Sequence, residues 1–217
     1  TGVIGAPQAA AESMEALKAL DDLRDADLAK IRLNEAYFRA QFIKPKKARK
    51  ALIKALSKVE PGLVSYYEAK AWAALSDERL DRADEIDLGL RERKLKKALK
   101  KRIALMRQGD EILRQAVALK EPDAVFAGLL RLAESFEALG DDMLAAEDPK
   151  SLTPAQLQIY RDGVAEQAEA SWARAVQYLD GGVTVAQTVE WTGTHVDALR
   201  DQRARLMKKV EAGARRN

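Results

Sequence analysis

The chain has 217 residues, of which 47% are hydrophobic and 33% are charged. This composition is too apolar for a disordered chain and too charged for a membrane bundle, and no run approaches about 20 uninterrupted apolar residues. The lack of cysteine excludes disulfides, thiolate metal sites and cysteine nucleophiles. With a net charge of +3, the chain is only weakly basic. Glycine and proline are sparse while Ala, Leu, Lys, Arg, Glu and Asp dominate, so we expect an all-α protein.

Residues 9–119 form the first region, in which hydrophobic periodicity predicts long helices. A first helix is expected from about residue 9 to Lys44-Pro45, because a residue that precedes proline is disfavoured in helical geometry. A short helix then runs to about residue 58, and a third follows the break at Pro61-Gly62. A fourth helix is expected to begin at Ser76, a good N-cap followed by acidic residues, and to reach about Leu119. Gly89 and Gly109 are the two positions where this fourth helix could kink or break.

Residues 120–212 form the second region, a helical hairpin followed by a terminal helix. The hairpin helices are expected at about residues 122–146 and 154–179, since Pro122 and Pro154 each suit a first helical position. Thr153 is the expected N-cap of the second helix, and Gly181-Gly182 is expected to end it. The two helices should pack antiparallel with complementary large and small residues. The faces expected to meet are Leu129, Leu132 and Phe136 on the first helix, and Ala168, Trp172 and Ala175 on the second.

The spacing Leu129-x-x-Leu132-Ala133-x-x-Phe136, followed by Ala168-x-x-x-Trp172-x-x-Ala175, resembles the two halves of a tetratricopeptide repeat. The lengthened hairpin, with the sequence DPKSLTPAQLQIYRDG between its halves, looks like divergent repeats in large envelope proteins of gliding myxobacteria. The resemblance covers roughly residues 110–200. It implies stacked antiparallel hairpins, as a solenoid or an elongated bundle, and we expect residues 1–217 to form a single helical domain. It also implies a periplasmic or envelope location, with the cytoplasm as the alternative. The chain begins at Thr1 without Met, as expected of a processed chain or fragment.

The strongest charge signal is a basic segment in the fourth helix. Between Arg91 and Arg107 there are nine Lys or Arg residues and one Glu. Such a face attracts an acidic protein surface, phosphates or anionic lipid, and it can also be a solvated surface without a partner. Aromatic residues for base stacking are lacking, which disfavours nucleic acid. The residues expected to form an electrostatic binding face are Arg91, Arg93, Lys94, Lys96, Lys97, Lys100, Lys101 and Arg102.

Motifs for catalysis or for metal binding are lacking in the sequence. His195 is the single histidine, and one histidine cannot organise a site that needs three or four ligands, so we expect it to be structural or exposed. An i,i+4 stack with Trp191 would account for it. The acidic residues Glu134, Glu137, Asp141 and Asp142 are expected to spread over a solvated helix face rather than converge. We therefore expect no enzyme, no cofactor and no metal.

The sequence thus favours a non-catalytic protein-interaction scaffold with an acidic protein surface as the expected partner, and the resemblance implies a bacterial envelope or gliding-motility assembly as its setting. The alternative is a binder of nucleic acid or another anionic polymer through the basic residues of 44–58 and 91–107.

Overall fold

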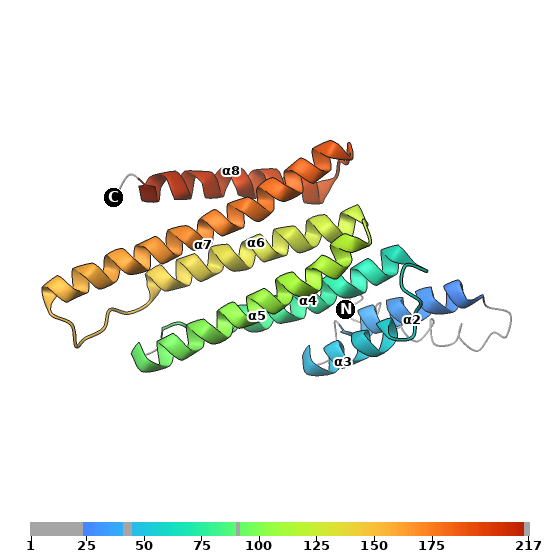
Figure 1. Cartoon of the computed structure of the whole chain (residues 1–217), viewed down its shortest axis with the longest axis horizontal. Coiled ribbons are helices and arrows are strands. Elements are labelled where there is room, and N and C mark those ends of the chain that lie inside the picture. Colours follow the sequence, from blue (N-terminus) through green and yellow to red (C-terminus); the bar gives the residue numbers. More distant parts are fainter. Residues whose placement is uncertain (1–23, 41–44, 90–91, 215–217) are drawn as a thin grey trace, which may run out of the picture. The chain divides into compact units, whose positions relative to one another are not determined.

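The computed structural model describes residues 24–40, 45–89 and 92–214. These residues form seven helices and no strand, which confirms the predicted all-α class (Figure 1). The helices are α2 (Asp25–Ala40), α3 (Pro45–Leu56), α4 (Ser65–Asp84), α5 (Glu92–Ala118), α6 (Pro122–Ala145), α7 (Pro154–Thr188) and α8 (Thr194–Ala214). None of them combines the length and the apolar character that a membrane crossing requires. The expected helix over residues 9–43 is represented by α2, and its earlier part lies outside the described residues.

The chain divides into two compact units. The first comprises Thr1–Glu78 and Glu111–Val125, and the second comprises Arg79–Asp110 and Phe126–Asn217. This division differs from the single domain with a boundary near residue 119 that the sequence suggested. The dividing points fall within α4, α5 and α6, so single helices contribute apolar residues to both units. Segments of the two units therefore alternate along the chain.

The core of the first unit contains buried residues from α2, α3, α4 and the connection between α3 and α4, namely Ala29, Leu33, Ala36, Leu52, Ala55, Val59, Val64, Ala71 and Leu75. The entry into α4 is fixed by Glu68, which is itself buried. Its carboxylate accepts hydrogen bonds from the backbone N–H groups of Gly62 and Val64, each at 3.0 Å. Gly62 has a φ of +82°, a conformation that glycine adopts without steric cost. This turn explains why Pro61-Gly62 separates two helices, as the sequence predicted.

The helix start predicted at Ser76 is wrong, because α4 runs through this residue to Asp84. Ser76 is fully buried on the same face as Leu80 and Ala83, so the buried stripe continues across the expected N-cap. The interruption occurs instead between α4 and α5, where the N–H of Gly89 donates to Asp87 Oδ1 at 2.7 Å. The expected continuous helix to Leu119 is thus wrong, and the interruption lies near Gly89, one of the two positions where the sequence allowed a break. Gly109 does not break α5, and it lies buried within the helix.

The end of α7 also differs from the prediction. Thr153 is its N-cap, as expected, and forms a reciprocal capping box with Gln156. The helix then continues through Gly181-Gly182 and ends at Thr188. A Cβ atom at Gly182 would lie 2.9 Å from Leu199 Cδ1 of α8. The glycine therefore permits a close approach of two helices and does not end one.

Three contacts define the antiparallel register of α6 and α7. A Cβ at Gly140 would lie 2.5 Å from Trp172 Nε1, and one at Gly182 would lie 3.4 Å from Leu129 Cδ1. The rings of Phe136 and Tyr178 stack at 5.6 Å. The predicted burial of Ala168, Trp172 and Ala175 is confirmed. Their expected pairing with residues 129–136 is wrong by about two turns, because these α6 residues face a later part of α7.

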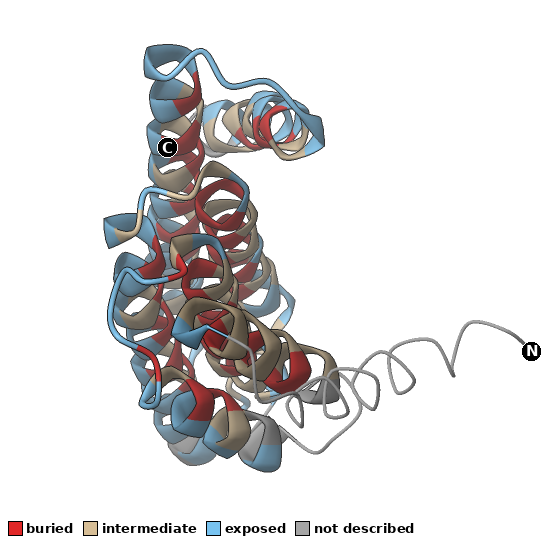
Figure 2. Ribbon diagram, turned by 90° about the vertical axis from the view of Figure 1, so that its right-hand side faces the viewer, coloured by how far each residue is buried: buried red, intermediate tan, exposed pale blue. Residues whose placement is uncertain are grey.

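This register leaves the beginning of α7 without a partner in α6. No residue from Pro154 to Gln167 is buried, whereas Ala168 and Trp172 are. Figure 1 shows that the first part of α7 extends beyond the end of α6 and that the loop between them spans this distance. In Figure 2 the buried residues lie on the helix sides that face neighbouring helices. The first half of α7 consequently forms one side of an open region in the second unit.

Candidate protein-binding surface

The basic segment of α5 is only in part an exposed surface. Arg91 lies outside the described residues, and Arg93 belongs to α5 but its side chain is not described. Five lysines are exposed, and none of the five forms an ion pair with a described residue. We call this set the basic surface: Lys94, Lys96, Lys97, Lys100 and Lys101.

Arg102 does not belong to this surface, and its prediction as a surface residue is wrong. Its side chain is 0% exposed, because it lies on the buried face of α5 together with Ala98 and Leu105. The guanidinium donates to Asp142 of α6 at 2.5 Å and to Asp84 of α4 at 3.4 Å. Arg102 is therefore part of the interior of the second unit, where it joins three helices.

Asp84 is the residue on which this interior network converges. It accepts hydrogen bonds from Arg102 of α5 and, at 2.8 Å, from Arg131 of α6. The hydroxyl of Ser135 donates to it at 2.7 Å. Buried polar groups are stable only when they are satisfied in this way. Asp84, the last residue of α4, thus holds α5 and α6 through charge, while Asp81, Glu85 and Asp87 beside it are exposed.

The acidic side chains of α6 make a second network, with α8. Glu137 is buried and accepts hydrogen bonds from Gln202 at 3.2 Å and from Arg205 Nη2 at 2.7 Å. Lys209 donates to Asp141 Oδ2 at 2.7 Å. The expectation of a solvated acidic face is therefore wrong for Glu137. Within the described part of the chain, no group of three or more His, Asp or Glu side chains could hold a metal ion.

The two glutamates one turn apart on α6 have opposite pKa shifts. Burial works to raise the pKa of Glu137, but the hydrogen bonds from Arg205 and Gln202 outweigh it, and the net pKa is lowered from 4.5. Desolvation raises the pKa of Glu134, and repulsion from Glu137 adds to this rise. The same type of residue therefore stabilises the fold when ionised at position 137 and opposes it when ionised at position 134.

We expect Glu137→Gln to lower the free energy of unfolding at pH 7 by about 1.5–3 kcal/mol, the usual contribution of hydrogen bonds to charged groups. Because the folded pKa of Glu137 lies below its unfolded value, its contribution is present above about pH 4.5 and is lost as the pH falls through the folded pKa. Denaturant unfolding from pH 7 to pH 3 should show the difference between variant and wild type shrinking. Glu134→Gln is the control, and it should leave stability at pH 7 unchanged or slightly raised. Equal losses for both variants would contradict the assignment.

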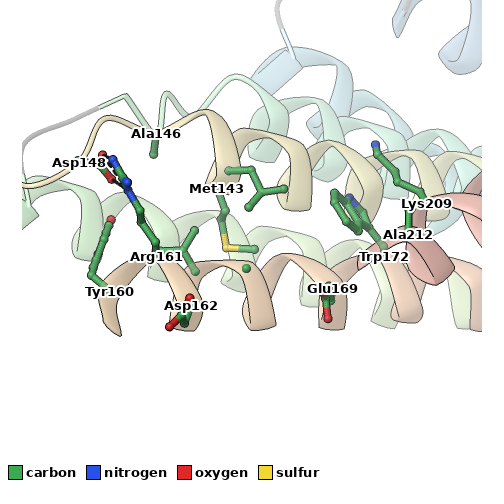
Figure 3. Close-up of a pocket in the computed structure, with 13 residues that line it drawn as sticks. Met143, Ala146, Asp148, Tyr160, Arg161, Asp162, Glu169, Trp172, Lys209 and Ala212 are labelled. Carbon is green, nitrogen blue, oxygen red and sulfur yellow. Dashed lines mark hydrogen bonds and ion pairs between the residues drawn. The ribbon is translucent and has the colours of Figure 1, made fainter. Parts of the chain in front are cut away.

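An open cavity of about 640 Å³ lies beside the unpartnered half of α7 (Figure 3). Trp172 and Lys209 lie at one end of it, and the ammonium of Lys209 is 4.8 Å from the centre of the Trp172 ring. At the other end Arg161 Nε donates to Asp148 Oδ2 at 3.1 Å, which joins the loop to α7. Met143 forms part of the wall between them. The cationic groups of the cavity, Arg161 and Lys209, are ion-paired, whereas the carboxylates of Asp162 and Glu169 line it without an ion pair to a described residue.

His195 and Trp191 do not show the expected i,i+4 arrangement within one helix. Trp191 precedes α8 and its side chain is exposed. Its backbone N–H donates to the carbonyl of Ala186 at 2.9 Å. His195 is half-buried in the first turn of α8. The pair cannot be a helical i,i+4 stack, because only His195 is in the helix.

The two predicted basic regions belong to different units. The exposed basic side chains of the first basic region are Lys47, Lys50 and Lys54 of α3 and Lys58 just after it, and the side chain of Lys46 is not described. The basic surface of α5 has the higher density of exposed charge, with five lysines in eight positions. Searches of family models, curated proteins and solved structures found no match to this chain.

Proposed function

We propose that this protein is a non-catalytic helical scaffold whose basic surface attracts an acidic protein partner. The observation that carries this proposal is that the five lysines are exposed and form no ion pair with any described residue. A surface with five exposed lysines in eight positions acts at long range and mainly increases the association rate.

We also propose that the scaffold is tetratricopeptide-like. The antiparallel α6–α7 pair and its small residues at close contacts support this. Gly140 and Gly182 permit the approach of Trp172 and Leu199, which is the complementarity of small and large residues that repeat hairpins use. The resemblance to envelope proteins is the basis for proposing a bacterial envelope or gliding-motility assembly as the setting.

The test replaces Lys96, Lys97, Lys100 and Lys101 with glutamine. The melting temperature should change by less than about 2 °C, because exposed charges contribute little to stability. Association with a fluorescein-labelled, Glu-rich 15-residue peptide, measured by stopped flow, should slow by about tenfold or more at 50 mM salt. The difference should shrink at 300 mM salt, because screening weakens the attraction. Association at the wild-type rate in low salt would contradict the proposal.

A matched control replaces Lys47, Lys50 and Lys54 of α3 and Lys58 just after it with glutamine, which removes the same charge from the other unit. This variant should retain most of the association rate. Labelled duplex DNA and single-stranded RNA address the alternative function. Binding of either that is tighter than peptide binding, with a steep loss of affinity as salt increases, would favour an anionic-polymer binder instead.

A further inference from the structure

A groove of about 340 Å³ lies between α5 and α7 in the second unit, and residues of α6 line its base. Its apolar residues include Met106 of α5 and Leu139 of α6, which are 1% and 3% exposed. Phe136 and Tyr178, stacked at 5.6 Å, also line it. An open hollow with an apolar base suits a single aromatic or aliphatic side chain from a partner.

The rim of this groove is positively charged. Arg107 of α5 and Arg174 of α7 line it, and both are exposed. Arg174 is held in place, with its guanidinium 4.8 Å from the centre of the Tyr178 ring and its Nη1 donating to Gln177 at 2.8 Å. Cations fixed at the edge of an apolar hollow favour carboxylates on the segment that enters it.

The acid among the lining residues, Asp110, does not cancel this charge. The hydroxyl of Tyr178 accepts a hydrogen bond from Arg174 at 3.2 Å and also hydrogen-bonds to Asp110. Burial raises the pKa of Tyr178, and the charge of Asp110 adds to the rise. Asp110 is therefore engaged within the protein, and the two arginines at the rim exceed it in charge.

The groove continues the basic surface of α5. Lys96, Lys100 and Arg107 recur at spacings of four and seven, so they lie on one side of the helix. Ile103, which lines the groove, is on the same side. A segment bound in the groove can thus contact Arg107 and also Lys100, which lies two turns away along α5.

We propose that the α5–α7 groove binds an acidic peptide segment, with an aromatic or large aliphatic side chain inserted among Met106, Phe136 and Leu139. Its neighbouring Asp or Glu residues pair with Arg107, Arg174 and Lys100. This inference rests on the proposed function and specifies where the acidic partner docks. The basic surface attracts the segment, and the groove determines which acidic segments stay bound.

The test uses an array of 15-residue peptides with the wild-type protein. The central residue is Trp, Phe, Leu or Ala, and the flanks are rich in Glu, Gln or Lys. The strongest binding is expected for Glu-rich flanks with Trp, Phe or Leu at the centre, at least about tenfold above the same flanks with Ala. Equal binding of all Glu-rich peptides, whatever the central residue, would overturn the groove assignment.

Two variants test the location of binding. Ala170→Glu places a negative charge at the exposed groove position on α7 and should weaken binding of the Trp-centred peptide by at least about tenfold. The double variant Arg107→Gln/Arg174→Gln should do the same without adding bulk. The matched control is Ala155→Glu, the same change on the same helix at an exposed position outside the groove. It should remain within about twofold of wild type, since glutamate is a good helix former.

The outcomes separate this inference from the function on which it rests. If the glutamine variant of the four α5 lysines loses binding while both groove variants keep it, the acidic partner docks elsewhere and the groove inference fails. If no Glu-rich peptide binds better than its Gln-rich counterpart, both proposals fail. Loss of binding in both groove variants, together with their unchanged melting temperature, supports the groove.

Discussion

Replacing Trp172 with alanine is expected to lower the free energy of unfolding by about 3–5 kcal/mol, through lost burial and the cavity left behind. The side chain is 7% exposed, and its indole N–H donates to Asp141 Oδ1 at 3.0 Å. Its ring lies against Gly140 of α6 and under the ammonium of Lys209 of α8. One side chain thus contacts two helices, so its loss should loosen both packings. Urea or guanidinium unfolding followed by circular dichroism measures the change.

Two control variants separate burial from the hydrogen bond. Trp172→Phe keeps an aromatic ring but removes the N–H donor, and it should cause a smaller loss than alanine does. Ile159→Ala removes an apolar side chain from the same helix at a site that is 73% exposed, and its effect should stay within about 0.5 kcal/mol. A loss below about 1 kcal/mol for Trp172→Ala would mean that the α6–α7–α8 packing described here is incorrect.

Replacing Arg102 with alanine is expected to lower the free energy of unfolding by about 2–5 kcal/mol, the usual effect of truncating a large buried side chain, since its partners Asp84 and Asp142 are themselves partly exposed to water. The side chain is fully buried, and its loss leaves a cavity while Asp142 and Asp84 each lose a donor. Asp84 retains Arg131 and Ser135, so the network should weaken rather than vanish. Thermal and denaturant unfolding should report the loss.

The comparison for Arg102 is Arg107→Ala, which removes the same type of side chain from the same helix at an exposed position. Its effect on stability should be within about 0.5 kcal/mol. Had Arg102 belonged to the basic surface, the two variants would behave alike. Equal, small effects would therefore contradict the burial of Arg102 and return it to the surface.

The local signals in the sequence were most reliable where they act within one helix. The start of α6 at Pro122 and the start of α7 at Pro154, with Thr153 as N-cap, agree with the structure. A proline at the first position and a capping side chain act on their own turn, so neighbouring helices hardly change them.

Signals that depend on a neighbouring helix were misleading. Ser76 is a good N-cap by composition but lies buried within α4, and Gly181-Gly182 continue α7. A serine can begin a helix or sit in a tight contact, and a glycine can end a helix or admit a neighbour. The residue type is the same in both cases. At Gly182 the deciding fact is that Leu199 occupies the space of a Cβ.

The sequence by itself determined the all-α class, the helix starts that are set by local caps, and the concentration of charge on α5. These follow from composition, from 3.6-residue periodicity and from turn chemistry, which are properties of short segments. Only the tertiary structure decided that Arg102 is interior while Lys100 and Lys101 are exposed, that Glu137 pairs with α8, and that α6 meets α7 two turns from the predicted register. The reason is that a charge and its burial depend on partners 18 to 68 residues away, and a one-dimensional pattern carries no information about which distant side chain fills the facing position.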